Sequence, residues 1–494
     1  MLKLVDRAQG FGQWPAIADA AGTHSYADLL DASHGRAGTL LDGANDLSGA
    51  RVALMVEPSF EYVTWHWATW RAGGVTVPIS LTHPAPEIEY LLDDAKPEVV
   101  VASETYADVL RPLIGDRPIR FVDSANPGDH QLDLPDIESN RSATILYTSG
   151  TTGRPKGVVS THFGIEAQIT SLVEAWEWST EDSILLVLPL HHVHGLINVV
   201  GSALWSGAVC EMLPRFDATS CWEHLASGSL TLFMAVPTIY HRLIAAWEQA
   251  SPQDQRRMSE GCRRLRVMIS GSAALPVTVL ERWREISGHT LLERYGMTEI
   301  GMALSNPYQG ERKPGWVGSP LPGVEVRLIG EDGAPVPNGS PGEIQVRGPA
   351  VFTEYWERPD ATTEAFVDGW FQTGDIAISE QGLYRILGRE SVDIIKTGAE
   401  KVSALEIEEV LLGHEAVSEA AVVGVPDEEW GERVLAAIVL TDPQVDVAEL
   451  TSWCKASLAP FKVPKEFHVV PELPRNAMGK VMKPEIARRL TEPG

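Results

Sequence analysis

Short apolar runs alternate with helix-like segments in the first third of the chain, and this alternation limits the possible folds more than any other feature. The runs at 51–56, 75–79 and 97–102 are rich in valine and alanine, as buried strands are. Between them lie an aromatic-rich segment, 60–72, and a charged segment, 86–94, that begins with proline; both are predicted to be helices. Strands separated by helices indicate a mostly parallel sheet covered by helices.

The same rhythm returns further along, with apolar runs at 184–189, 230–237 and 265–272. Each of these runs ends in a loop that contains Pro, Gly, His or Ser. Ligands of open α/β sheets bind beyond the carboxyl ends of the strands. These strand ends are therefore predicted to form the floor of one site.

The pattern changes after about residue 318. Segments 323–329 and 342–347 alternate apolar and polar residues between Gly/Pro turns, which predicts a small antiparallel, β-rich subdomain. From about residue 388 a compact α+β region follows, with a helix at 404–412 and a strand at 420–425. A chain of 494 residues is too long for a single core, so we expect at least two domains.

Acidic residues outnumber basic ones, 67 to 40, and give a net charge of −27 with histidine neutral. This charge argues against nucleic acid or an anionic membrane as a partner, and any anionic ligand needs a local basic pocket. The first seven residues hold no apolar leader, and the apolar region 184–210 is interrupted by proline and histidine, so we expect a cytoplasmic protein. Four cysteines without a C-x-x-C pair are predicted to be buried thiols of a reducing compartment: Cys210, Cys221, Cys262 and Cys454.

The strongest motif is a ten-residue loop that follows the apolar run 143–147. It combines three glycines and four hydroxyl residues with two cations. Glycine permits a close backbone approach, so that free N–H groups and hydroxyls can bind phosphate oxygens. The spacing is not that of a Walker loop, and the alternative is a solvated surface turn. The loop consists of Thr148, Ser149, Gly150, Thr151, Thr152, Gly153, Arg154, Pro155, Lys156 and Gly157.

Two later segments carry carboxylates suited to a nucleotide. Segment 293–299 offers a tyrosine that can stack on a base, Thr298 for a phosphate and Glu299 as a hard oxygen ligand for Mg²⁺; the alternative is a strand-to-helix turn. Segment 370–375 is predicted to present Asp375 on a glycine turn, where a carboxylate suits two adjacent ribose hydroxyls. Taken alone, this segment favours the alternative, an aspartate in an ordinary β-turn.

Two basic segments complete the set. Arg389 lies in segment 388–398, and Lys480 lies in segment 474–480 beside a glycine, close to the C-terminal end of the sequence. A lysine is a point charge on a flexible stem, so it can enter and leave a site. The alternative for Lys480 is a solvated surface lysine.

In this order, the five segments resemble the adenylate-forming superfamily: acyl- and aryl-CoA synthetases, luciferases and the adenylation domains of peptide synthetases. The resemblance covers essentially the whole chain and rests on Thr-Ser-Gly-Thr-Thr-Gly-x-Pro-Lys-Gly, Tyr-Gly-x-Thr-Glu, Thr-Gly-Asp and the late Gly-Lys. It implies that a carboxylate attacks the α-phosphate of ATP, expels pyrophosphate and then passes as an acyl group to a thiol, commonly that of CoA.

The resemblance also implies an α/β fold in two domains. The large N-terminal domain, 1–388, would consist of stacked, mostly parallel sheets covered by helices, together with the β-rich subdomain. The smaller α+β domain, 389–494, would be mobile and would rotate between the two steps, which removes the lysine and opens a path for the thiol.

Each motif residue receives a role from the same resemblance. Lys480 would bridge the attacking carboxylate and the α-phosphate, with Thr298 and Glu299 also catalytic and Glu299 carrying Mg²⁺. ATP, Mg²⁺ and CoA are thus the expected cofactors. The residues implied to bind ATP are Thr148, Ser149, Gly150, Thr151, Thr152, Gly153, Lys156, Gly271, Ser272, Ala273, Glu293, Tyr295, Gly296, Met297, Asp375 and Arg389, of which Asp375 and Arg389 would hold the ribose.

The CoA site and the hinge are less closely defined. Lys401, Arg433 and Lys462 are basic candidates for the CoA phosphates, and the alternative for each is a surface charge. Ser391 stands where the family often has Lys or Asp, and the segment up to 398 is one residue longer than is common. Ala399 replaces a usual second glycine.

Two arginines narrow the choice of acid. Arg242 and Arg294 are predicted to lie toward the acyl side, where an uncharged acid would leave a guanidinium desolvated and unpaired. A dicarboxylate would pair with it bidentately. Segments 301–308 and 391–398 resemble malonyl-CoA synthetases, so malonate is the expected substrate and methylmalonate a secondary one. The alternative is that both arginines form structural salt bridges.

Three histidines, His191, His192 and His194, follow the strand at 184–189. A zinc site is rejected, because no second ligand cluster accompanies them in the sequence. In the family this turn borders the acyl pocket, so His192 and His194 are predicted to be wall residues that hydrogen-bond a carboxylate.

Three other functions stay open. The acid could be a medium-chain or aryl acid, or the thiol acceptor could be a separate carrier protein instead of CoA. A binding-only relative is a further alternative, which the retention of Lys156, Glu299, Asp375 and Lys480 disfavours.

Overall fold

Two large mixed sheets form the centre of the computed structural model, which describes residues 2–122, 133–148, 154–397, 400–427, 430–441, 445–475 and 481–491. The seven-stranded sheet has parallel neighbours from β7 through β4, β3 and β5 to β6, and antiparallel pairs at its other edge. Its order is β18 (Glu354–Tyr355), β8 (Lys156–Thr161), β7 (Ser142–Thr148), β4 (Val75–Pro78), β3 (Arg51–Met55), β5 (Val99–Ala102) and β6 (Ile119–Phe121).

The nine-stranded sheet is parallel from β13 to β1 and antiparallel at both edges. Its order is β15 (Ser319–Pro320), β14 (Gly301–Ser305), β13 (Leu292–Met297), β12 (Val267–Ser270), β11 (Leu232–Ala235), β9 (Ser183–Leu186), β10 (Val209–Met212), β1 (Pro15–Asp19) and β2 (Gly22–Ser25). The predicted α/β fold class, with mostly parallel sheets, is therefore confirmed.

Helices cover these sheets, and one helix, α3, is buried on nearly every side. Helix α3 begins after Ser59, whose side chain accepts a hydrogen bond from the Tyr62 N–H, and it buries both Trp65 and Trp67. It shares a core with residues of both large sheets. The helices of this part are α1 (Lys3–Gln9), α2 (Tyr26–Leu41), α3 (Phe60–Arg71), α4 (Ala85–Ala95), α5 (Ala107–Leu110), α6 (His162–Ala175), α7 (Ser202–Ser206), α8 (Ala218–Ser227), α9 (Pro237–Gln249), α10 (Pro252–Cys262) and α11 (Val277–Ser287), with a π-helix at His194–Gly201.

Two smaller sheets follow. The predicted β-rich subdomain contains β16 (Glu325–Ile329), β17 (Gly342–Arg347), β19 (Phe366–Val367), β20 (Trp370–Glu380) and β21 (Leu383–Arg389), with α12 (Pro359–Glu364) beside it. The last sheet contains β22 (Ile394–Thr397), β23 (Glu400–Ser403), β24 (Val417–Asp427), β25 (Gly431–Leu440) and β26 (Glu466–Val469), with α13 (Ala404–Leu412), α14 (Val447–Ser457) and α15 (Lys483–Thr491).

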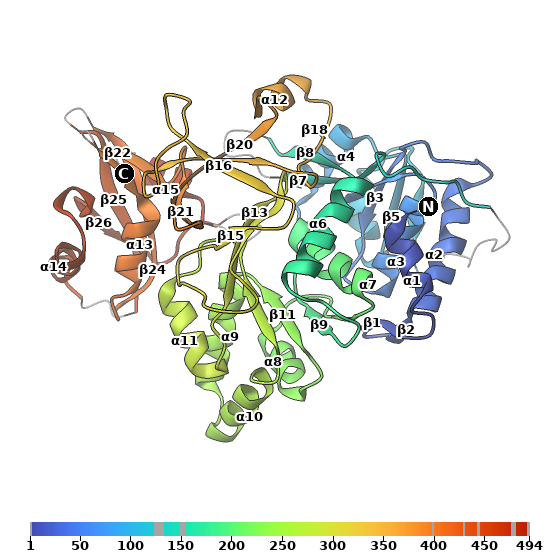
Figure 1. Cartoon of the computed structure of the whole chain (residues 1–494), viewed down its shortest axis with the longest axis horizontal. Coiled ribbons are helices and arrows are strands. Elements are labelled where there is room, and N and C mark those ends of the chain that lie inside the picture. The colour runs from blue at the N-terminus through green and yellow to red at the C-terminus, as the bar shows by residue number, and fades with distance from the viewer. Residues whose placement is uncertain are drawn as a thin grey trace.

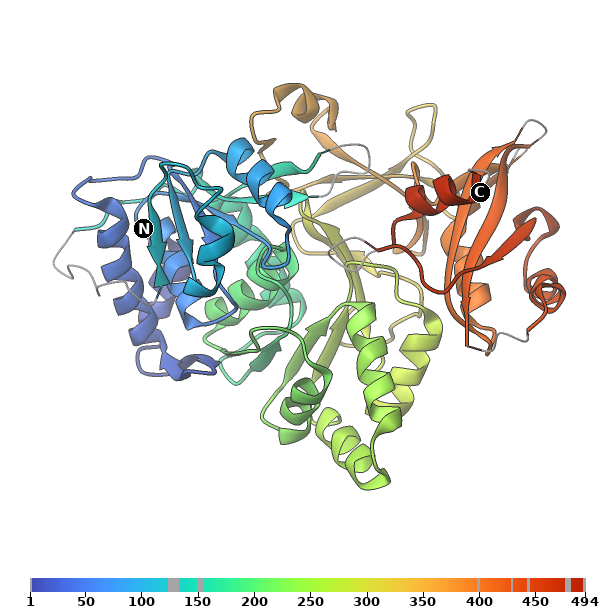
Figure 2. The same ribbon diagram turned by 180° about the vertical axis from the view of Figure 1, so that it is seen from behind.

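The arrangement in space follows the chain. Figure 1 shows the orange and red elements β22–β26 and α13–α15 at one end of the long axis, and the blue N-terminal elements at the other. The yellow strands β16 and β20 lie between the two, and Figure 2 shows the same order from behind. The part of the chain that the structure describes contains no helix that is long and apolar enough to span a membrane.

One expected turn is wrong. Asp375 was predicted to lie on a glycine turn, but it lies inside the eleven-residue strand β20. The strand continues because it pairs with β17 on one side and β21 on the other. Gly374 absorbs an irregularity with a left-handed φ of 70°, which favours glycine.

A buried ion cluster joins the C-terminal helix α15 to helix α13 and to the residue that precedes β22. Lys483 Nζ lies 2.5 Å from Asp393 Oδ1 and 2.7 Å from Glu408 Oε1, and Lys483 is 8% exposed. Removing one member of a buried ion cluster leaves the other charges desolvated without compensation. The lysine therefore stabilises the fold more than a surface lysine does.

We expect Lys483→Met to lower the free energy of unfolding by about 3–5 kcal/mol, because two buried carboxylates lose their cation. Urea denaturation of the full chain measures this change. Lys455→Met on the exposed face of α14 is the matched control and should change the value by less than about 0.5 kcal/mol. Equal losses in the two variants would contradict the prediction.

Candidate active site

The two flanks of the predicted phosphate loop form a β-hairpin. Strand β7 ends at Thr148 and β8 begins at Lys156, and Thr148 pairs with Lys156 and Tyr147 with Gly157. A Cβ at Gly157 would lie 2.7 Å from an Ile145 methyl group, so this position requires glycine. The intervening Ser149, Gly150, Thr151, Thr152 and Gly153 lie outside the described residues.

Lys156 and Glu299 meet on one aromatic side chain. The Lys156 ammonium lies 4.8 Å from the centre of the Tyr355 ring, and the Tyr355 hydroxyl donates a hydrogen bond of 3.0 Å to Glu299 Oε1. Burial raises the pKa of the Glu299 carboxyl. A cation and a carboxylate from distant motifs thus lie around Tyr355, a residue that the sequence analysis did not identify because no recognised motif surrounds it.

Asp375 joins two other predicted residues. The Tyr295 hydroxyl donates to Asp375 Oδ2 at 2.6 Å, and Arg389 Nε donates to Asp375 Oδ1 at 2.9 Å. The two ionic partners face each other because Asp375 and Arg389 are directly opposite in the β20–β21 pair. A cavity of about 410 Å³ lies against them, lined by Thr373, Gly374, Arg389, Glu390, Ser391 and Lys396.

The acyl-side candidates form a second group, at the carboxyl ends of β12 and β13. These strands are parallel neighbours, so Gly271 and Ser272, which follow β12, lie beside Arg294 of β13. A Cβ at Gly271 would lie 2.5 Å from Arg294 Cζ, so the arginine occupies space that only glycine leaves open. Ser272 Oγ and His194 Nδ1 are 3.2 Å apart, and Arg294 Nη2 donates to the same oxygen at 3.5 Å.

The electrostatics of this group are unusual. Arg294 is 3% exposed, and burial lowers its pKa to about 9. Within the described part of the chain, Arg294 Nε and Nη1 have no hydrogen-bond partner. The pKa of His194 lies well below 6.5, first because the ring is buried and second because Arg294 is near. A neutral imidazole and a guanidinium with two N–H-bearing nitrogens lacking a partner among the described residues therefore lie on either side of the Ser272 hydroxyl.

Arg242 lies elsewhere on this side of the molecule. It is exposed on α9, and its guanidinium lies 5.1 Å from the centre of the Phe216 ring. Its predicted contact with the acid stays a prediction. His192 is partly exposed; burial lowers its pKa to about 4, and its ring centre is 4.1 Å from that of His191.

The remaining ATP candidates lie around these groups. Glu293 Oε1 accepts a hydrogen bond of 3.0 Å from the Gly315 N–H, and burial raises the Glu293 pKa to about 8. Gly296 and Met297 end β13, and Thr298 begins the turn into β14; the structure thus has a strand-to-strand turn at 293–299, not a strand-to-helix turn. Ala273 follows Ser272 on the exposed side.

The described contacts do not bring together the CoA candidates and Lys480. Lys401 pairs with Glu331 at 2.5 Å, Arg433 with Glu466 at 2.7 Å and Lys462 with Glu406 at 2.7 Å. Lys480 and Ala399 lie outside the described residues. The roles of these basic residues stay predictions.

Comparisons with known proteins identify the family of the chain. Residues 4–356 match the family described as AMP-binding enzyme, and residues 406–480 match the AMP-binding enzyme C-terminal domain. The chain is 45% identical to the mitochondrial malonate–CoA ligase ACSF3 of Xenopus laevis, over 98% of this chain and 91% of that one.

Two solved structures are similar over nearly their whole length. ATP-bound MatB from Rhodopseudomonas palustris is 35% identical with a TM-score of 0.90, over 99% of both chains. A malonyl-CoA ligase in a ternary product complex with methylmalonyl-CoA and AMP is 36% identical with a TM-score of 0.71, over 96% of this chain and 100% of that one.

Glu293 makes the stability of the protein dependent on pH. The folded state holds the Glu293 proton up to about pH 8, whereas a free carboxyl with a pKa of 4.5 loses it earlier. The native state therefore binds more protons in this window, and its stability falls as the pH rises through it. The glutamine of Glu293→Gln cannot ionise, so that variant does not lose stability from this site as the pH rises.

We expect the unfolding free energy of Glu293→Gln, relative to the parent protein, to rise between pH 5 and pH 8 by up to about 1.4 kcal/mol per pH unit. Urea denaturation without ligands at several pH values measures the difference. Glu311→Gln, at an exposed carboxylate, should show no such trend. A constant difference for Glu293→Gln across this window would refute the prediction.

Proposed function

This chain belongs to the AMP-binding enzyme family, and we propose that within it the chain is an ATP-dependent acid–CoA ligase whose preferred acid is malonate, with methylmalonate second. The reaction yields acyl-CoA, AMP and pyrophosphate. Malonate is named in the Xenopus relative, and methylmalonyl-CoA is bound in a solved ligase that is 36% identical.

The observation that carries the choice of acid is the Arg294 guanidinium. It is buried, and two of its nitrogen atoms lack a partner among the described residues. An unpaired buried cation is costly, so it is retained where a ligand supplies the anion. The second carboxylate of malonate would accept a hydrogen bond from one of these two nitrogen atoms, while Ser272 lies at Nη2 of the same guanidinium and His194 lies beside Ser272.

The first step is an in-line displacement. A carboxylate oxygen of malonate forms a bond to the α-phosphorus of ATP, the bond from that phosphorus to the bridging oxygen breaks, and pyrophosphate leaves with the electron pair. Neutralising the phosphate charges and aligning the reacting atoms lower this barrier more than covalent catalysis does. Lys156 and the predicted loop would hold the β- and γ-phosphates, Asp375 and Arg389 the ribose, and Lys480 the reacting carboxylate and the α-phosphate.

Glu299 is suited to a magnesium ion that takes its other ligands from the nucleotide and from water. Among the described residues, no group of three or more His, Cys, Asp or Glu side chains is arranged to hold a metal. Mg²⁺ commonly uses one or two carboxylates together with substrate phosphates and waters, so one buried Glu299 beside Thr298 suffices. When bound, the ion would neutralise phosphate charge.

In the second step the CoA sulfur bonds to the acyl carbon of malonyl-adenylate, and the bond from that carbon to the AMP oxygen breaks. We infer that residues 389–494 rotate as a domain between the steps. The two solved relatives have nearly equal identity but TM-scores of 0.90 and 0.71, which a different arrangement of rigid parts would produce. Lys401, Arg433 and Lys462 remain the proposed contacts for the CoA phosphates.

Three finer points accompany this proposal. A cytoplasmic location is proposed from the sequence, although the Xenopus relative is named as mitochondrial. A carrier protein is the alternative thiol acceptor, and transfer to a carrier phosphopantetheine but not to free CoA would favour it. A medium-chain or aryl acid is the alternative substrate.

We expect pyrophosphate release with ATP, Mg²⁺ and CoA to be fastest with malonate in a panel that also contains methylmalonate, succinate, acetate, octanoate and benzoate. Arg294→Met should lower kcat/KM for malonate at least about 100-fold, because a buried charge pair is lost, and should affect octanoate far less. Arg282→Met, at an exposed arginine of α11, is the matched control. Preference for octanoate or benzoate would contradict the role of Arg294 in binding malonate and would indicate that this arginine is structural.

Lys480 gives a separate test of the chemistry. Lys480→Ala should reduce malonate-dependent pyrophosphate release by at least about 100-fold, because the charge that aligns the two reacting anions is removed. Transfer from synthetic malonyl-adenylate to CoA should persist, since the lysine acts in the first step. Full pyrophosphate release in this variant would refute the adenylation role.

A further inference from the structure

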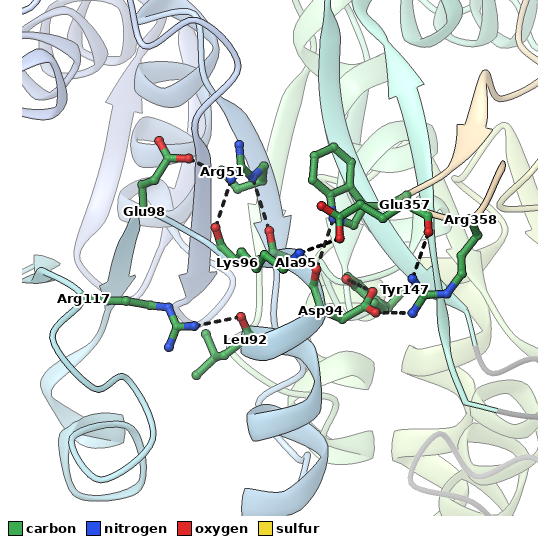
Figure 3. Close-up of polar contacts among 11 residues, drawn as sticks. Arg51, Leu92, Asp94, Ala95, Lys96, Glu98, Arg117, Tyr147, Glu357 and Arg358 are labelled. Atoms are coloured by element: carbon green, nitrogen blue, oxygen red, sulfur yellow. Dashed lines mark hydrogen bonds and ion pairs between the residues drawn. The ribbon is translucent and has the colours of Figure 1, made fainter.

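A carboxylate lies at an unfavourable place in helix α4. Asp94 is in the last turn of α4, where the partial negative charge of the helix end disfavours another anion. Arg51 and Arg117 donate to carbonyl oxygens of this same helix end, at Ala95 and Leu92, but Asp94 points the other way, as Figure 3 shows. Local preference therefore does not explain Asp94, and its tertiary contacts must.

Those contacts lead to the predicted phosphate loop. The Tyr147 hydroxyl donates to Asp94 Oδ2 at 2.8 Å, and Arg358 Nη2 donates to Asp94 Oδ1. The Asp94 side chain is 9% exposed, whereas the Arg358 side chain is 42% exposed, so the carboxylate is buried and its cationic partner reaches solvent. Tyr147 directly precedes Thr148, the first residue of the loop motif.

The other flank of the loop is held by the same elements. From α4, the Tyr90 hydroxyl donates to the Pro155 carbonyl at 2.8 Å, and the Arg154 guanidinium lies 5.4 Å from the centre of the Tyr90 ring. The Trp356 N–H donates to the Gly157 carbonyl at 2.7 Å, and the Trp356 indole N–H donates to the Asp94 carbonyl at 3.2 Å.

Charge balance is part of this arrangement. A carboxylate behind a loop that receives a triphosphate would repel the nucleotide if it stood alone. Arg358 neutralises Asp94, so that Asp94 anchors Tyr147 without adding a net negative charge. Burial raises the pKa of Tyr147, which keeps its hydroxyl protonated as the donor in this network.

We propose that Asp94, Tyr147 and Arg358 are positioning residues for ATP: together with Tyr90 and Trp356 they fix both flanks of the phosphate loop. They touch neither substrate nor reacting atoms and act through the loop. This inference rests on the proposed use of the loop for the β- and γ-phosphates, and it is independent of which acid is activated.

The test compares two nucleotides by calorimetry on the full chain. The analogue α,β-methylene-ATP with Mg²⁺ reports on the loop, whereas AMP lacks the phosphates that the loop holds. We expect Arg358→Met to raise the Kd of the analogue about tenfold and that of AMP less than about twofold, because the uncompensated Asp94 charge faces the loop. The double variant Asp94→Asn with Arg358→Met should recover most of the loss.

Tyr147→Phe removes a single hydroxyl and keeps the test decisive if Arg358→Met does not fold. It should raise the Kd of the analogue about threefold and leave that of AMP unchanged. Arg117→Met is the matched control, since Arg117 binds the same helix end without touching the loop flanks, and it should change neither Kd.

A folded Arg358→Met or Tyr147→Phe variant that binds the analogue as tightly as the parent would overturn the proposal, and so would equal weakening of the analogue and AMP. Absence of analogue binding by the parent protein would instead overturn the proposed function, and this inference with it. If the pyrophosphate-release assay shows a preference for octanoate instead of malonate, the comparison of the nucleotide Kd values still tests this inference.

Discussion

The two large sheets are built mostly from parallel strands, and parallel pairing forces each connection to cross back over the sheet before the next strand begins. The carboxyl ends of successive strands therefore gather at one edge, and the segments that follow them become neighbours. Gly271 and Ser272 after β12 meet Arg294 of β13 for this reason. The candidate active site is thus a consequence of how the sheets are connected.

Burial then sets the chemistry of the groups that are gathered. Arg294 lies in contact with Gly271 and beside Ser272 and His194, with a neutral imidazole and two unpaired guanidinium nitrogens among the described residues. Arg294 is itself buried, so an anionic ligand gains more from this cation than from one at the surface. The overall charge of −27 makes such local cations necessary for anionic substrates.

Side-chain contacts around the candidate active site connect residues of distant motifs. Tyr355 lies between Lys156 and Glu299, and Asp94 links Tyr147 to Arg358 through α4. The residues that shape the loop therefore come from three regions of the chain. Each contact is an ordinary hydrogen bond, ion pair or cation–π contact, but its loss would affect the loop because Glu299 and Asp94 are carboxylates with little exposure to solvent.

The sequence by itself determined the family, the alternation of strands and helices and the chemistry of the motifs, because these depend on residues close together in the chain. Strand and helix periods and a ten-residue glycine-rich loop are local patterns, and β3, β4 and α13 lie where those patterns predicted them. Tertiary structure decided the rest. The Asp94–Arg358 pair joins residues 264 positions apart, the unpaired burial of Arg294 depends on packing against Gly271, and Asp375 lies within a strand because β17 and β21 pair on both sides. Burial, charge compensation and strand pairing arise between distant segments, and only the folded chain brings those segments together.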